Sequence, residues 1–289
     1  MSNVMSDKRY AVGHMRQRHR WLRKHFAIPA EHGAWAMWLG PFAVGLGLAW
    51  KLDLAVLWVW LGMLLLFLAR QPMLILVKAL SGRRSREDIQ PALVWLILYG
   101  GLALIPAGLL IGSGRAALFW LALPALPALL WQLWLVTRRA ERQMTVELAG
   151  SGALALAAPV AYFAATGRFD LIALLAWLLC WFQSAAAIVY VYLRLEQRRL
   201  TVAPARRDQW IMGRRAVLYH TLNLVASIAL AATRVLPALV PLAFAAMLAE
   251  VARGTFHPAV GAKPQALGFS QTVATIVFIV LLVLAYRLA

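Results

Sequence analysis

The sequence predicts an all-α, polytopic membrane protein with about nine transmembrane helices, its N-terminus inside and its C-terminus outside. Of the 289 residues, 63% are hydrophobic and 14% are charged, whereas soluble domains are about half apolar and a quarter charged. Apolar runs long enough to cross a bilayer follow one another along the chain. The basic residues lie mainly in every second connection between these runs, which places most of them on one side of the membrane. The thirteen tryptophans fit this class, because indoles favour the headgroup level of a bilayer.

A membrane-spanning helix needs about 20 mostly apolar residues. The segments that approach this requirement are 33–50, 54–80, 91–112, 115–136, 147–165, 169–193, 216–233, 235–251 and 266–287. Glycines recur inside several of them and let helices approach closely in a bilayer, where lipid offers no hydrophobic drive for association. We therefore expect residues 29–289 to form one compact helical bundle.

The lysines and arginines orient these segments. With the N-terminus in the cytoplasm, 24 of the 29 basic residues fall on the inner side. The five on the other side are Lys51, Arg115, Arg168, Arg234 and Arg287. This asymmetry follows the positive-inside rule, and it supports an odd number of spans because a missed helix would disrupt the alternation.

Residues 1–28 form a basic cytoplasmic arm that lacks the apolar core of a cleavable signal. The arm either lies on anionic headgroups or serves only to fix the orientation. The net charge of +18 does not indicate nucleic acid, because the basic residues cluster between apolar runs and form no binding stripe. Cys180, the single cysteine, excludes an internal disulfide, and no metal site is expected.

The first candidate site lies where the first span begins. Glu31 and His32 stand side by side there, and Glu31, Trp35 and Trp38 share one helical face. Glu31 and His32 are candidate catalytic residues, and Trp35 is a candidate ligand-binding residue. The alternatives are an N-terminal dipole role for Glu31 and an interfacial belt for the tryptophans.

Arg70 and Gln71 lie inside the second apolar run beside Pro72. A charge in hydrocarbon costs about 2.5–3.5 kcal/mol on insertion scales, so an intramembrane arginine is a functional candidate. We expect Pro72 to break or kink the helix and free backbone carbonyls near a ligand. The alternative is that the span ends near residue 71, with Arg70 reaching the interface and residues 73–80 on the membrane surface.

The sixth and seventh spans carry a second group of polar residues. Arg194 and Asn223 are candidate ligand-binding residues, and His220 is a candidate catalytic residue. By the predicted topology Arg194 and His220 lie near the cytoplasmic face, as do Glu31 and Arg70. We therefore expect these groups to converge on one cytoplasm-facing pocket within the membrane.

The motif Pro29–Trp38, with its Glu-His-Gly-Ala-Trp-Ala core, resembles the signature of the YwiC-like family of bacterial integral membrane proteins. The resemblance covers most of the membrane region, and its first motif is the specific part. It implies a multi-pass protein of the bacterial cytoplasmic (inner) membrane and no particular activity.

A weaker likeness is to the UbiA superfamily of intramembrane prenyltransferases, and it implies a UbiA-like arrangement of nine helices with the N-terminus inside. That superfamily holds Mg²⁺ and a prenyl diphosphate with paired aspartates after helices two and six. The corresponding stretches here, residues 69–73 and 192–196, contain no aspartate. Magnesium prefers carboxylate oxygens, and Arg70 and Arg194 cannot supply them, so the likeness extends to the fold and not to metal-dependent ionisation.

The leading functional hypothesis is a pocket for an anionic or amphiphilic, lipid- or isoprenoid-like ligand. Arg70 and Arg194 would bind the head group, and His32 or His220 would transfer a proton if the protein is a metal-independent transferase-like enzyme. One alternative is a transporter or an accessory subunit of a membrane complex. Another is haem or quinone binding through His32 and His220. Membrane lipids are the expected partners, and the pattern indicates no particular cofactor or oligomeric state.

Overall fold

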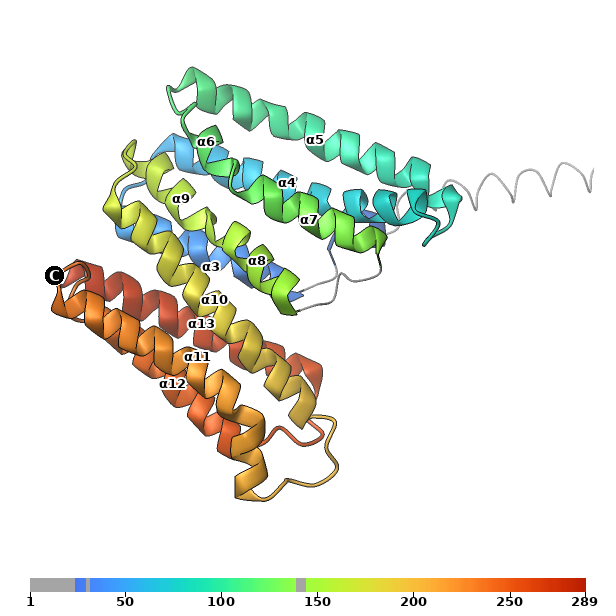
Figure 1. Ribbon diagram of the computed structural model, residues 1–289. Helices are drawn as coiled ribbons and strands as arrows, with labels where there is room; N and C mark the ends of the chain where they lie inside the picture. The colour runs from blue at the N-terminus through green and yellow to red at the C-terminus, as the bar shows by residue number, and fades with distance from the viewer. Residues whose placement is uncertain (1–23, 30–31, 139–143) are drawn as a thin grey trace, which may run out of the picture. The chain divides into compact units, whose positions relative to one another are not determined.

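The computed structural model describes residues 24–29, 32–138 and 144–289, and these residues form helices and connecting turns without a strand (Figure 1). The short helices are α2 (Lys24–Ala27), a 3₁₀ turn (Arg86–Asp88) and α6 (Leu118–Ala122). The others are α3 (His32–Ala49), α4 (Leu54–Leu80), α5 (Ile89–Gly112), α7 (Ala125–Thr137), α8 (Met144–Ala155), α9 (Ala157–Thr166), α10 (Leu171–Gln197), α11 (Arg206–Ala232), α12 (Val240–Phe256) and α13 (Pro264–Arg287).

The prediction of a helical, multi-pass membrane protein is confirmed. Each predicted span coincides with one helix or with two consecutive helices, such as α8 and α9. Within the described residues, seven helical segments are long and apolar enough to cross a membrane, and the apolar helix Gly33–Ala49 is shorter. The count of nine spans, the UbiA-like arrangement and the sidedness of the termini stay predictions.

Helix α4 differs from the expectation at Pro72. It continues through this residue to Leu80, so no helix break occurs there. Pro72 is buried inside this helix.

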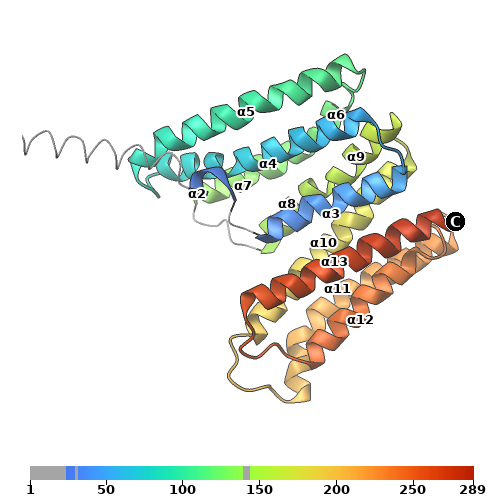
Figure 2. The same ribbon diagram turned by 180° about the vertical axis from the view of Figure 1, so that it is seen from behind.

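The described residues form two compact units, one of which comprises α2, residues 57–116 and residues 130–138. In this first unit, α4 and α5 run side by side (Figure 1) and share a core that includes Leu65, Ala69 and Tyr99. Phe26 of α2, only 1% exposed, packs against Ile75 of α4 and Ala92 of α5. Figure 2 shows α2 at the end of α4. The apolar Phe26 ring therefore anchors the residues that precede the first long helix.

A tyrosine hydroxyl reinforces this anchor. The Tyr99 hydroxyl donates a hydrogen bond to the Ala27 carbonyl oxygen at 3.0 Å, and Tyr99 is 8% exposed. We expect Tyr99→Phe to weaken the docking of α2 by about 1 kcal/mol, the usual net value of one hydrogen bond. The measurement is amide hydrogen exchange of residues 24–29, which should become faster while exchange in α13 stays unchanged. Equal exchange of α2 in both proteins would show that the hydrogen bond contributes nothing.

The second unit comprises residues 32–56, 117–129 and 144–289. Helix α3 packs on α9 at Gly45, where a Cβ atom would lie 2.0 Å from the Ala158 carbonyl oxygen. Only glycine allows this crossing, so the predicted role of small residues is confirmed at this position. A core of buried apolar side chains joins α3, α9, α10, α12 and α13.

The ends of this unit's first and last helices are also connected. The Arg287 guanidinium donates hydrogen bonds to the Gly47 and Leu48 carbonyl oxygens at 2.9 and 3.1 Å. Its Cζ atom lies 4.6 Å from the centre of the Trp50 ring. Arg287 thereby satisfies carbonyls at the C-terminal end of α3, where a cation is electrostatically favoured.

Candidate functional site

The C-terminal part of the second unit contains a small polar cavity. Helices α10, α11, α12 and α13 run beside one another (Figure 1) and contribute its walls. The polar lining residues are Gln183, Tyr190, His220, Glu250, Gln271 and Thr275. The cavity offers about 10 Å³ to the centre of a water molecule, which is room for about one water or one hydroxyl group.

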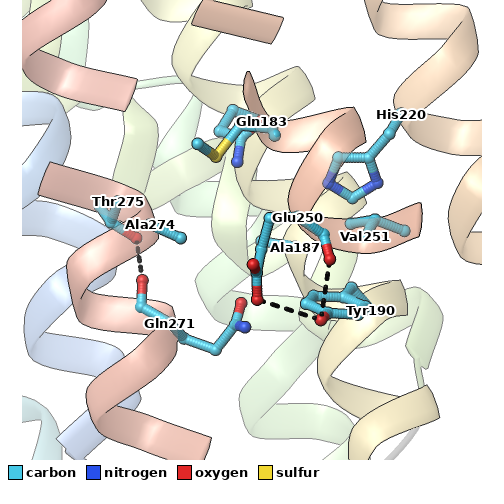
Figure 3. A pocket seen from close by; sticks show the side chains of 10 residues that line it. Gln183, Ala187, Tyr190, His220, Glu250, Val251, Gln271, Ala274 and Thr275 are labelled. Atoms are coloured by element: carbon cyan, nitrogen blue, oxygen red, sulfur yellow. Dashed lines mark hydrogen bonds between the residues drawn. The ribbon is translucent and has the colours of Figure 1, made fainter. Parts of the chain in front are cut away.

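Tyr190 of α10 and Glu250 of α12 form the polar centre of this cavity (Figure 3). The Tyr190 hydroxyl lies 3.3 Å from the Glu250 Oε1 atom and 3.4 Å from the Glu250 carbonyl oxygen. This approach depends on Gly254, where a Cβ atom would lie 1.8 Å from the tyrosine hydroxyl oxygen. On the outer side the carboxylate is paired with Arg253, at 2.8 Å between Nη2 and Oε2. The tyrosine and the arginine thus hold Glu250 from two sides.

His220 lies on the α11 side of the cavity and is 3% exposed. Its Nδ1 atom is 2.9 Å from the Ala216 carbonyl oxygen. A carbonyl can only accept, so Nδ1 donates this hydrogen bond, and a neutral ring keeps Nε2 as an acceptor. The imidazole packs edge-on against the Tyr190 ring, with the ring centres 6.4 Å apart. His220, selected from the sequence as a candidate catalytic residue, thus lines a polar cavity, and its catalytic role stays a prediction.

A larger groove adjoins the cavity on the outer face of α12 and α13. It has a volume of about 520 Å³ and is lined mainly by apolar side chains, including Ala246, Phe269, Val273 and Val277. Met247, Glu250 and Ala274 line both the groove and the cavity. A mainly apolar groove and a small polar cavity therefore share three lining residues within one compact unit.

Arg194, predicted to bind a ligand, is engaged with the C-terminal end of α12. Its Nη1 atom lies 2.8 Å from the Gly254 carbonyl oxygen, 2.9 Å from that of His257 and 2.9 Å from the Gln197 Oε1 atom. Its Cζ atom lies 5.8 Å from the centre of the Tyr190 ring. The Nε atom is buried without a hydrogen-bond partner within the described residues. In this structure the guanidinium supports the helix end beside the cavity and is not among the cavity's lining residues.

The remaining predicted residues lie elsewhere. Arg70 and Gln71 belong to the first unit, and the Gln71 side chain donates to the His25 carbonyl oxygen at 3.0 Å. Asn223 donates to the Phe182 carbonyl oxygen at 2.9 Å and so joins α11 to α10. The Trp35 ring lies tilted by 41° against that of the buried Trp38, with ring centres 6.5 Å apart. Glu31 and the side chain of His32 lie outside the described residues. The meeting of all these groups in one pocket stays a prediction.

Of the polar residues of the cavity, only His220 was predicted as a site residue; Gln183, Tyr190, Glu250, Gln271 and Thr275 were not. Glu250 carried a usable signal, since it is the single acidic residue within the apolar run 235–251, and intramembrane carboxylates mark functional sites. Gln271 and Thr275 carried none, because isolated uncharged polar residues are common in membrane helices. In the described part of the chain, no three His, Cys, Asp or Glu side chains gather as a metal site would require.

Comparison with known proteins finds similarity in the first half of the chain. Residues 28–162 match the family model described as YwiC-like protein. The chain is 28% identical over 130 residues to "Uncharacterized protein YwiC" of Bacillus subtilis (strain 168), a match that covers 43% of this chain and 48% of that protein. The chain thus spans about half the length of this curated relative. No solved structure matches. The matched residues end before α10, so every polar residue of the cavity lies beyond them.

Proposed function

We propose, from the helices that follow the YwiC-like match at residues 28–162, that the protein binds an amphiphilic, lipid-like molecule within the membrane. The molecule's polar head enters the cavity and its apolar chain lies in the groove between α12 and α13. The observation that carries this proposal is that Met247, Glu250 and Ala274 line both spaces.

The dimensions of the groove support this occupant. Sites for small molecules have volumes of about 300–1,000 Å³, are mostly apolar and contain few polar groups. The groove, at about 520 Å³, falls within this range, and its charged residues are the paired Glu250 and Arg253. The groove is lined by α12 and α13 alone, and we take the surroundings of these helices to be lipid, so a molecule would enter the groove laterally from the bilayer.

The depth of the polar residues also supports the proposal. We take the protein to span a bacterial inner membrane nine times with its N-terminus inside, as the charges predict; a UbiA-like order of the helices is not needed. Tyr190, Glu250 and Gln271 are then each six or seven residues from the cytoplasmic end of their helix. At 1.5 Å per residue they lie about 10 Å below that end. Three helices thus place polar groups at one depth.

The test uses photoreactive amphiphiles with a common alkyl chain. Four probes carry a diazirine near the methyl end and a hydroxyl, amine, carboxylate or phosphate head, and the protein is reconstituted in lipid nanodiscs. We expect at least one probe to label peptides from residues 246–253 and 269–277 in a saturable manner. Ala249→Trp places an indole in the groove and should reduce this labelling at least about tenfold, because a filled groove excludes the chain.

Leu242→Trp is the matched control for this substitution. Leu242 is an exposed residue of the same helix and does not line the groove, so labelling should remain at the wild-type level. Unsaturable labelling spread evenly over all exposed apolar faces, by every probe, would contradict the proposed function.

A further inference from the structure

The exposed side of α11 changes from basic to apolar within one helical turn. The first ten residues of the helix contain two pairs of exposed arginines, Arg206 with Arg207 and Arg214 with Arg215. Beyond them the exposed side carries aliphatic residues that are 50% to 56% exposed, which are Leu218, Leu222, Val225 and Ile228. A helix that crosses a bilayer shows such a change where it passes from the headgroups into the hydrocarbon. The headgroup level on α11 therefore lies at Arg214 and Arg215.

An aromatic pair marks the same level. The rings of Trp210 of α11 and Phe256 of α12 are stacked, with their planes 8° apart and their centres 6.4 Å apart. Both side chains are exposed, at 47% and 39%. Trp210 lies one turn before Arg214 on the same face of the helix, because residues four apart are neighbours there. Tryptophan favours the headgroup level of a bilayer, so Trp210 independently supports the placement of Arg214 at that level.

The arginines of α11 carry positive charge that the protein itself does not balance. Within the residues that the structure describes, none of the four guanidinium groups takes part in a hydrogen bond or an ion pair. The single carboxylate of the helix, Asp208, lies about 9 Å along the axis from Arg214. Four arginines and one aspartate leave residues 206–215 with a net charge of +3. Such an excess at the headgroup level is complementary to a phosphate.

We propose that α11 carries a binding site for an anionic phospholipid of the surrounding bilayer. The Arg214 and Arg215 guanidinium groups bind the phosphate, to which the planar fork of an arginine is suited. The acyl chains lie along Leu218, Leu222 and Val225. A phospholipid fits both parts of this surface, whereas a free phosphate would leave the aliphatic part uncovered and an acidic soluble protein could not reach it. The site lies outside the groove of α12 and α13 and does not depend on the function proposed above.

The test compares two photoreactive phospholipids in nanodiscs of phosphatidylcholine. The probes carry a diazirine on identical acyl chains, and one has a phosphatidylglycerol head and the other a phosphatidylcholine head. We expect the anionic probe to reach half-maximal labelling of residues 216–228 at a mole fraction about tenfold below that of the zwitterionic probe, because each arginine near a membrane surface favours an anionic lipid severalfold. The preference should decrease at high salt, since salt screens exposed charges.

Two double variants test the position of the site. Arg214→Gln combined with Arg215→Gln should abolish the preference, so that both probes label at the same mole fraction. The matched control is Arg206→Gln combined with Arg207→Gln, which removes the same charge from the same helix about 12 Å farther from the hydrocarbon. This control should keep a preference of at least about fivefold. All four side chains are exposed, so neither double variant removes a core contact.

The other outcomes overturn the proposal. Equal labelling by the two probes in the wild-type protein would show that α11 has no site for an anionic head. An equal loss of preference in the two double variants would show diffuse attraction to the charge of the helix and no site at Arg214 and Arg215. If soluble glycerol phosphate displaces the anionic probe as effectively as unlabelled phosphatidylglycerol does, the arginines recognise a free phosphate and not a lipid. The alkyl probes described above report on the groove separately.

Discussion

Gly45→Ala should destabilise the protein by about 3 kcal/mol or more. The added methyl group would lie 2.0 Å from the Ala158 carbonyl oxygen and 2.8 Å from the carbonyl carbon. These are backbone atoms, which cannot rotate away as a side chain could, so α3 and α9 would have to separate. Overpacking of a well-packed core costs about 1–3 kcal/mol and sometimes more, and a backbone obstacle places this site at the upper end.

The measurement is unfolding in mixed micelles of dodecyl maltoside and SDS, followed by the fluorescence of the tryptophans. Gly150→Ala is the matched control, since Gly150 also lies in a helix of the second unit and a Cβ atom there would meet nothing within 4 Å. Its free energy of unfolding should be unchanged or slightly higher, because alanine favours a helix over glycine. Equal stability of the two variants would show that α3 and α9 do not cross as closely as described.

Arg194→Met should lower the free energy of unfolding by about 2–3 kcal/mol, the range of hydrogen bonds that involve a charged group. Methionine preserves much of the side chain's apolar length and removes the donor that reaches the Gly254 and His257 carbonyl oxygens. Those carbonyls belong to the end of α12, where intrahelical partners are missing and a positive charge is favoured. Arg194→Lys keeps the charge but not the planar fork and should recover only part of the loss.

The Arg194→Met variant distinguishes a structural role of Arg194 from the predicted ligand contact. Arg199→Met serves as the control, because Arg199 is an exposed residue that follows α10, and its stability should match the wild type. If Arg194 acts mainly on a ligand, the protein without added amphiphile should unfold normally while the labelling by the alkyl probes disappears. That result would contradict the structural role and restore the original interpretation.

The helices could be predicted from the sequence because their signal is local. A bilayer requires runs of a given length, and each run from 33–50 to 266–287 coincides with described helices. Which helices pack against each other cannot be predicted from such local patterns. Nothing in the pattern indicates that Gly45 meets Ala158 or that Tyr190 meets Glu250, since small and aromatic residues occur throughout the chain.

The candidate site was predictable only in part for the same reason. His220 was selected as a polar residue in an apolar run, and the structure places it at the cavity. Arg194 was selected for its charge, but its partners are backbone carbonyls, which any sequence supplies. Pro72 was expected to break or kink a helix; α4 continues through it without a break, as membrane helices tolerate proline where other groups satisfy the freed backbone.

The contact between Arg287 and the end of α3 joins residues that are 240 positions apart in the chain. During synthesis, the ribosome completes α3 long before α13 exists, and the Gly47 and Leu48 carbonyls must then find other partners such as water or lipid headgroups. The second unit consequently reaches its final arrangement only when its last helix has entered the bilayer. Newly made chains therefore pass through an incompletely assembled stage, and quality-control proteases in the membrane would meet the chain in that stage.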